Sequence, residues 1–268
     1  MKVQDIYFYP VKSLGGLRTA AGRVMERGFE YDRRWMLVDE KNVFISQRSD
    51  PQLSLLTTKV TQEGIVVSSK EDPERGVIIP FAIEEPIVTE VSIWDDRVKA
   101  SGVGEKCDQW FSEYLGRSCR LVHLPETGQR GIDARYAVHE EQVSFADAFP
   151  YLLIGQASLD DLNRKLEVPV GMNRFRPNIV FCGAEPFEED RWKEIQIGAV
   201  KFKVAKPCAR CVITTVDQET GIKGKEPLLT LSNYRRIGNK VLFGQNLIAL
   251  NEGIIRENDP LEVLSYRD

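Results

Sequence analysis

The chain has 268 residues, of which 42% are hydrophobic and 28% charged, and its formal net charge is −4. This composition is that of a soluble globular protein with one large or two modest domains, and it excludes a disordered chain or a fibre. The acidic balance argues against a general nucleic-acid-binding protein. No apolar run approaches the roughly 20 residues of a membrane-spanning helix, and residues 1–5 show no signal-peptide core. We therefore expect no membrane anchor and a cytoplasmic location.

The first hundred residues predict mainly β structure. Residues 3–9 are a strand candidate that Pro10 ends, and residues 35–38 and 43–45 flank a polar turn, which predicts a hairpin. Further strands are predicted at residues 64–67, 76–79 and 87–94. Short strands at this close spacing predict a barrel or a sandwich.

A mixed pattern begins near residue 104. One helix is predicted by apolar residues at helical spacing before Gly116, namely Cys107, Trp110, Phe111, Tyr114 and Leu115. A second is predicted to begin with Ser158 as its N-cap, and a short third one with Pro227 at its first position. The remaining predicted strands are 178–181, 195–197, 200–204, 246–250 and 261–264. The sequence thus predicts an α+β protein that is mostly β, with a first domain at 1–100 and a second at 101–268.

The cysteine and histidine content restricts the possible sites. The odd number of cysteines and the missing secretion signal argue against a disulfide framework. Two histidines are too few for a multi-histidine metal centre, and they argue against a histidine-dependent triad. The residues concerned are Cys107, Cys119, Cys182, Cys208, Cys211, His123 and His139.

The most informative pair is Cys208 and Cys211, which lie three positions apart. Pro207 cannot donate a hydrogen bond within a sheet, so we expect it to end the preceding strand and to leave both cysteines on a turn. Lys206 and Arg210 place positive charge beside the two sulfur atoms. Such neighbours favour the thiolate, which is the reactive and metal-binding form of cysteine.

Four interpretations of this pair remain open on residue chemistry alone. A structural zinc site needs a second close pair of ligands, which the other cysteines do not provide. A thioredoxin-like dithiol is expected at the start of a helix, whereas the β-branched run 212–216 favours a strand. The pair could also be two small buried side chains, or a single thiolate bound to a soft transition metal beside a structural cysteine.

Several segments, taken in order, carry a resemblance to a known family. They are Tyr9–Ser13 (YPVKS), Asp32–Trp35 (DRRW), Ser144–Leu153 (SFADAFPYLL), Asn173–Asn178 (NRFRPN), Lys206–Asp217 (KPCARCVITTVD) and Phe243–Asn246 (FGQN). The chain resembles the MOSC-domain proteins, and most closely the group of the mitochondrial amidoxime reducing component and its bacterial relatives. The resemblance implies an N-terminal MOSC-type β-barrel domain followed by a MOSC β-barrel decorated with helices.

The same resemblance implies a molybdenum cofactor, Mo-molybdopterin, with Cys211 as the ligand of the metal. The residues implied to hold the pterin and its phosphate are Lys12, Ser13, Arg33, Arg176, Asn178 and Arg210. Asp147, Ala148 and Phe149 are implied to lie in a loop that passes the cofactor, and Asp147 is also a candidate proton donor. These residue types suit the group, because thiolate binds soft metals and guanidinium and lysine bind phosphate.

The implied activity is that of a molybdenum oxidoreductase, which removes oxygen from small N-hydroxylated substrates such as amidoximes and N-hydroxylated bases. Some bacterial relatives carry a ferredoxin domain, which needs a ligand set of four cysteines, and the cysteines of this chain cannot supply that set. We therefore expect electrons from a separate reductase, a flavin, haem or iron–sulfur protein. The alternative is a cofactor carrier or sulfur-transfer module without turnover, since fold alone does not settle function.

Overall fold

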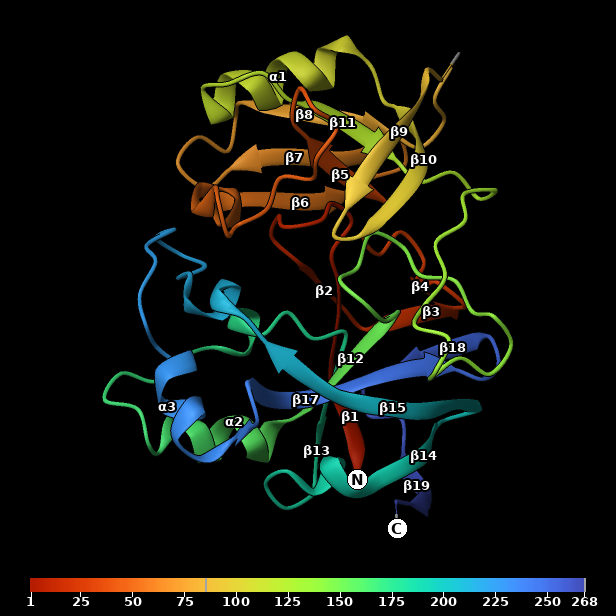
Figure 1. Cartoon of the computed structure of the whole chain (residues 1–268), viewed down its shortest axis with the longest axis vertical. Coiled ribbons are helices and arrows are strands. Elements are labelled where there is room, and N and C mark those ends of the chain that lie inside the picture. The colour runs from red at the N-terminus through yellow and green to blue at the C-terminus, as the bar shows by residue number, and fades with distance from the viewer. Residues whose placement is uncertain (85, 268) are drawn as a thin grey trace.

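The computed structural model describes residues 1–84 and 86–267, which form two lobes stacked along the longest axis (Figure 1). Strands dominate both lobes, so the predicted α+β class with mostly β structure is confirmed. The α-helices of the described part are α1 (Glu105–Leu115), α2 (Gln156–Asn163) and α3 (Leu228–Tyr234). None of the helices in this part of the chain is both long and apolar enough to cross a membrane.

The upper lobe contains two small antiparallel sheets. One has the order β5 (Trp35–Val38), β11 (Arg120–His123), β10 (Asp96–Gly102) and β9 (Val88–Ile93). The other has the order β6 (Leu56–Val60), β7 (Gly64–Ser69) and β8 (Gly76–Pro80). Helix α1 buries Cys107 and Phe111 against these strands, as its apolar spacing predicts, and it ends at Gly116 in the left-handed conformation (φ 66°).

The lower lobe is built on a sheet of nine strands among the described residues. Its order is β19 (Leu261–Tyr266), β14 (Trp192–Ile197), β15 (Val200–Arg210), β17 (Lys240–Ala249), β12 (Tyr151–Gly155), β13 (Ile179–Cys182), β1 (Lys2–Phe8) and β2 (Leu17–Thr19), with β16 (Arg236–Ile237) on β17. A small sheet lies beside it: β18 (Gly253–Arg256), β3 (Ala21–Met25) and β4 (Gly28–Phe29). The short 3-10 helices are η1 (Pro51–Leu55), η2 (Met172–Arg174), η3 (Glu188–Arg191) and η4 (Val212–Thr215).

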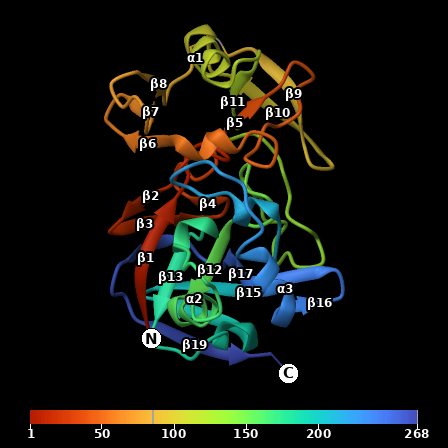
Figure 2. The same cartoon turned by 90° about the vertical axis from the view of Figure 1, so that its left-hand side faces the viewer.

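The first strand of the chain belongs to the lower lobe (Figure 2). Val3 of β1 pairs with Phe181 of β13, and both are buried in the core of that lobe. Beyond β1 the chain rises toward the other lobe, where Val11 forms a bridge with Trp35. Residues 9–13 therefore run between the lobes. The division after residue 100 stays a prediction, although the pairing of β1 with β13 crosses it.

Two predictions around the cysteine pair are wrong. Strand β15 does not end before Pro207 but continues to Arg210, so Cys208 lies within the strand. Register shifts on both sides of Pro207 accommodate its missing donor, which is the usual function of a bulge. The run after Cys211 forms η4 rather than a strand, because the hydroxyls of Thr214 and Thr215 bond to the carbonyls three positions before them.

Two helix starts and one hairpin also differ from the sequence prediction. Gly155 rather than Ser158 is the N-cap of α2, since the Ser158 hydroxyl instead donates to the buried carboxylate of Glu189 (2.9 Å). Helix α3 begins at Leu228, so Pro227 is its N-cap and not its first residue as predicted. This difference of one position is within the usual uncertainty of helix ends. The hairpin predicted after β5 is reduced to a single bridge from Val38 to Phe44.

Candidate functional site

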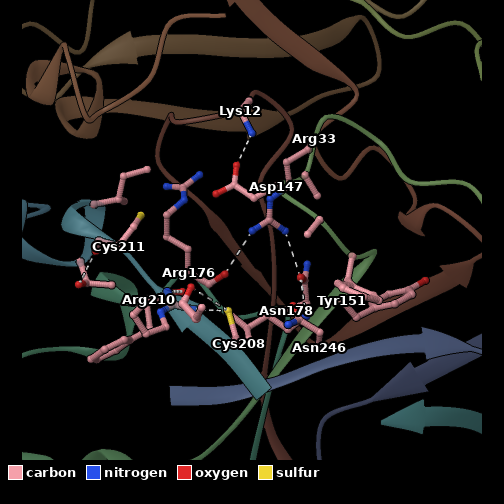
Figure 3. Close-up of a pocket in the computed structure, with 18 of the residues that line it drawn as sticks. Lys12, Arg33, Asp147, Tyr151, Arg176, Asn178, Cys208, Arg210, Cys211 and Asn246 are labelled. Atoms are coloured by element: carbon pink, nitrogen blue, oxygen red, sulfur yellow. Dashed lines mark hydrogen bonds and ion pairs between the residues drawn. The ribbon is translucent and has the colours of Figure 1, made fainter. Parts of the chain in front are cut away.

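The ten residues proposed from the sequence all line one cavity of about 250 Å³ (Figure 3). They come from chain segments at the ends of strands: two follow β1, one precedes β5, three precede β12, two precede β13, and two end or follow β15. The ten are Lys12, Ser13, Arg33, Asp147, Ala148, Phe149, Arg176, Asn178, Arg210 and Cys211. The structure therefore brings together segments that lie up to about 200 positions apart, while the role of each residue stays a prediction.

The cavity carries an excess of positive charge. Five of its lining side chains are basic and one, Asp147, is acidic. Among the described residues, no carboxylate lies within ion-pair distance of Arg176, Lys206 or Arg210. The guanidinium of Arg176 donates only to the carbonyl of Leu14 (2.6 Å), and burial lowers its pKa to about 10. A cavity with partly buried cations that have no carboxylate partner is suited to an anionic ligand.

A stacked group forms one wall of this cavity. The guanidinium groups of Arg33 and Arg176 each lie 4.2 Å from the ring centre of Tyr9. Arg33 is fixed by the buried carboxylate of Asp32 (2.6 Å) and by the side-chain oxygen of Asn178 (3.1 Å). Burial raises the pKa of Tyr9, so its ring is neutral and contacts both cations. Tyr9 and Asp32 stand in the recognised motifs, but the sequence prediction gave them no role.

Backbone strain gathers at the same place. Nine non-glycine residues of the described chain have a clearly positive φ, and three of them are cavity residues proposed from the sequence: Ser13 (72°), Arg33 (49°) and Arg176 (53°). A fourth, Trp94 (56°), contacts the side chain of Asp147 at the cavity. Such conformations are disfavoured for residues with a side chain and persist where the surroundings enforce them, often at functional sites.

The two cysteines are held by different arginines. Arg210 donates to the sulfur of Cys208 (3.0 Å), and Arg48 donates to the sulfur of Cys211 (3.3 Å). The pair is thus asymmetric, and Figure 3 shows the two sulfur atoms apart. Within residues 1–84 and 86–267, no group of three or more His, Cys, Asp or Glu side chains could hold a metal ion. A metal at Cys211 would therefore find fewer than three such side chains around it in this part of the chain.

Arg48 was not found from the sequence. Its guanidinium bonds to Asp147 (3.1 Å) as well as to Cys211, and it stacks on Trp94 at 4.3 Å. Arg48 lies in a polar loop outside every recognised motif, so nothing local indicates that it reaches a sulfur 163 positions away. The structure adds it to the site as a link between a carboxylate and a thiol.

Lys12 and Asp147 form an ion pair at the cavity (2.6 Å). Burial lowers the pKa of Lys12 to about 8, although Asp147 opposes this shift. Burial disfavours ionisation of Asp147, but Lys12 and Arg48 outweigh it and hold its pKa well below the usual range. A carboxylate that stays ionised at neutral pH carries no proton and is therefore a poor general acid. The predicted proton-donor role of Asp147 remains a prediction, and its contacts suit it better to orienting Lys12 and Arg48.

The buried pair of Asp32 and Arg33 gives a first testable prediction. Replacing Asp32 by alanine leaves Arg33 beside Arg176 without a carboxylate, and it removes the acceptor of the Tyr9 amide (2.7 Å). We expect the free energy of unfolding, measured by urea denaturation, to fall by about 3–5 kcal/mol, as for other broken buried ion pairs.

The matched control is an exposed ion pair. Glu90 and Arg97 lie 3.1 Å apart on the surface of the upper lobe. Replacing Glu90 by alanine should change the free energy of unfolding by less than about 1 kcal/mol. A change at Asp32 as small as the change at Glu90 would show that the buried pair does not stabilise the wall of the cavity.

Comparison with known proteins defines the class to which this fold and cavity belong. The family model of the MOSC N-terminal beta barrel domain matches residues 1–118, and the model of the MOSC domain matches residues 140–262. Mitochondrial amidoxime-reducing component 1 is 34% identical in Mus musculus, over 98% of this chain and 82% of that protein. Its counterpart in Homo sapiens is 32% identical, over 98% and 82%. This chain belongs to the family of MOSC proteins with an N-terminal MOSC barrel that includes the mitochondrial amidoxime-reducing components.

A second group of relatives carries a different name. Molybdenum cofactor sulfurase of Oryza sativa subsp. japonica is 31% identical over 96% of this chain, which corresponds to 33% of that longer protein. The names of both groups support a function related to the molybdenum cofactor.

Proposed function

We propose that the chain binds Mo-molybdopterin in this cavity and reduces N-hydroxylated substrates, with electrons from a separate reductase. The observation that carries the proposal is the position of the Cys211 thiol in a cavity with basic side chains that have no carboxylate partner. The names of the relatives support the same direction.

The residues of the cavity fit such a group on their own chemistry. The Nε atom of Arg210 is buried without a hydrogen-bond partner, and Arg176 has only a carbonyl acceptor. A phosphate would satisfy both, because guanidinium groups bind phosphate through paired hydrogen bonds. The sulfur of Cys211 is the soft donor that molybdenum prefers. The side-chain amide of Asn178 is committed to Arg33 and to the backbone, so we expect it to position the arginine.

When bound, the cofactor would supply the two-electron chemistry that removes the oxygen of an N–OH group as water. The chain holds the site in place around that chemistry. The Cys211 sulfur would ligate the metal while Arg48 fixes its direction. Lys12 Nζ holds Asp147 and the Phe145 carbonyl (2.7 Å), which keeps one positive charge beside the anionic group. The Tyr9 ring contacts the guanidinium groups of both Arg33 and Arg176 and would help to position them.

The deciding experiment is reduction of benzamidoxime by purified protein loaded with molybdenum, using an artificial electron donor. Formation of benzamidine at many turnovers per metal supports the reductase. The second candidate is a cofactor carrier or sulfur-transfer module, which the cofactor sulfurase relatives favour. Full metal loading without turnover would favour that carrier. Absence of molybdenum after expression in a host that makes the cofactor would exclude both functions.

The lowered pKa of Lys12 predicts a pH dependence of cofactor binding. The amine is charged below pH 8 and loses its proton as the pH rises through about 8. Its attraction for an anion is therefore full at pH 7 and lost at pH 9. We expect faster molybdenum release at pH 9 than at pH 7, measured by metal analysis after dialysis. Lys12→Met should release the metal quickly at both pH 7 and pH 9. If the variant released the metal as slowly as wild type at pH 7, Lys12 would not hold the cofactor.

The same shift affects stability with the opposite sign. In the unfolded chain Lys12 keeps its proton up to a pKa near 10.5, whereas in the folded chain it loses the proton near 8. Between these two values the unfolded state binds more protons, so the contribution of Lys12 to the free energy of unfolding increases with pH. The wild-type protein should therefore release its metal faster at pH 9 without a loss in the free energy of unfolding that arises from Lys12.

A further inference from the structure

An exposed tryptophan occupies a turn position that normally requires glycine. Strands β9 and β10 pair Ile93 with Asp96, which leaves a two-residue turn of Trp94 and Asp95. Of these two, only Trp94 has a positive φ (56°), and glycine is the usual residue at the first position of such hairpin turns. The residue is nonetheless 47% exposed, so about half of its surface gains nothing from burial. A strained and exposed tryptophan indicates a functional constraint rather than a contribution to stability.

The turn lies at the cavity. The β9–β10 hairpin points from the upper lobe toward the lower one (Figure 1). The Nε1 atom of Trp94 lies 3.4 Å from Oδ1 of Asp147, and the guanidinium of Arg48 lies 4.3 Å from the centre of the indole. Arg48 also contacts the Cys211 sulfur, which places the ring one side chain away from the proposed metal ligand.

The ring is held in one orientation by its neighbours. Phe44 packs against it with ring centres 5.0 Å apart, at an angle of 52°. The Lys12 amine lies 5.4 Å from the centre of the Phe44 ring, so the aromatic pair is connected to the ion pair of Lys12 and Asp147. Arg48 and Phe44 thus support the indole while about half of its surface faces solvent. This arrangement is that of a preformed aromatic platform at the rim of a charged cavity.

We propose that Trp94 is a substrate-binding residue whose exposed surface stacks on planar, conjugated N-hydroxylated compounds, and this inference rests on the proposed reductase function. Aryl amidoximes and N-hydroxylated heteroaromatic bases present such a plane next to the N–OH group. A small aliphatic amidoxime lacks the plane and would reach the cavity without the contact. The platform therefore selects for the part of the substrate that does not react.

The test compares two substrates in three variants. In Trp94→Gly, KM for benzamidoxime should rise about tenfold with little change in kcat, as expected for a lost stacking contact made equally before and during reaction. KM for acetamidoxime should stay within about twofold of wild type, because no ring is bound. Trp94→Phe keeps a planar face and should restore most of the affinity for benzamidoxime. Asp95→Gly, in the same turn, is the matched control and should leave both KM values unchanged.

A purely structural role of Trp94 would predict a loss of stability in Trp94→Gly, whereas the binding role predicts none. Glycine relieves the positive φ, so the melting temperature of Trp94→Gly should equal or exceed that of wild type. A lower melting temperature together with equal losses for both substrates would overturn the proposal, as would an unchanged KM for benzamidoxime.

A direct binding measurement separates the failure of the platform from the failure of the proposed function. Benzamidoxime is titrated into molybdenum-loaded wild type and Trp94→Gly by calorimetry without an electron donor. Weaker binding to the variant supports the platform even if wild type shows no turnover, in which case only the reductase function fails. Equal binding to both proteins, or no measurable binding to wild type, overturns the platform even if turnover is normal.

Discussion

Replacing Cys211 with alanine is expected to abolish benzamidoxime reduction without unfolding the protein. The variant should also show a changed visible absorption of the bound molybdenum, because one of its sulfur ligands would be missing. The fold should survive because η4 depends on the backbone here: the Cys211 carbonyl accepts from the amide (3.1 Å) and the hydroxyl (3.0 Å) of Thr214, and alanine keeps that carbonyl. Turnover, absorption and circular dichroism of the purified variant check the three parts of this expectation.

Cys208→Ala is the matched control, since it changes the other sulfur of the same motif. Its side chain lies within β15 and accepts a hydrogen bond from Arg210, which keeps a second bond to the Phe175 carbonyl (2.7 Å). We expect activity to persist and the free energy of unfolding to fall by about 1 kcal/mol. Equal loss of activity in both variants would point to a dithiol mechanism and against a single metal ligand.

Replacing Arg176 with methionine is expected to stabilise the cofactor-free protein and to impair cofactor binding at the same time. Arg176 is half-buried beside Arg33 without an ion-pair partner of its own, and loss of solvation lowers its pKa to about 10. Removing an uncompensated, half-buried charge should raise the free energy of unfolding by about 1–3 kcal/mol. The molybdenum content after purification should fall about tenfold or more, as for other residues that support a metal group.

Arg174 provides the control for that experiment, two positions away on η2. It is paired with Asp217 (2.6 Å) and lies outside the cavity lining, so Arg174→Met should lose stability and keep its molybdenum. Opposite changes in stability for the two arginines would show that Arg176 is kept for a ligand. A destabilised Arg176→Met that retains its metal would instead assign Arg176 a structural role.

Local pattern predicted much of the fold. The helix that buries Cys107 and Phe111 follows directly from apolar spacing and a terminal glycine, and most predicted strands overlap strands of the structure. Local propensity failed where distant partners decide the conformation. Pro207 remains in a strand because β17 pairs with β15 on both sides of two bulges, and Thr214 turns into η4 through its own hydroxyl.

The sequence indicated residues that share one cavity, but it did not indicate the side-chain contacts that link them. The motif resemblance indicated Lys12, Arg33 and Arg176, which the structure brings to one cavity. Arg48 and Trp94 belong to no motif, and their proposed roles rest on contacts with Asp147 and Cys211 that only the folded chain creates. A sequence pattern records which residues recur together, but it does not record which side chain lies between a carboxylate and a sulfur.

The pairing of β1 with β13 has a consequence for how the protein is made. Lys2 pairs with Cys182, so β1 can pair with β2 early but lacks its partner on the other side until 180 further residues have been synthesised. At about 5–20 residues per second, that wait lasts roughly 10–40 s. Lys12 and Arg33 likewise cannot meet Arg176 and Arg210 before those distant segments have been synthesised. The cavity therefore forms only after the segments that contain Arg176, Arg210 and Asn246 have been synthesised, and the proposed cofactor would enter it after that point.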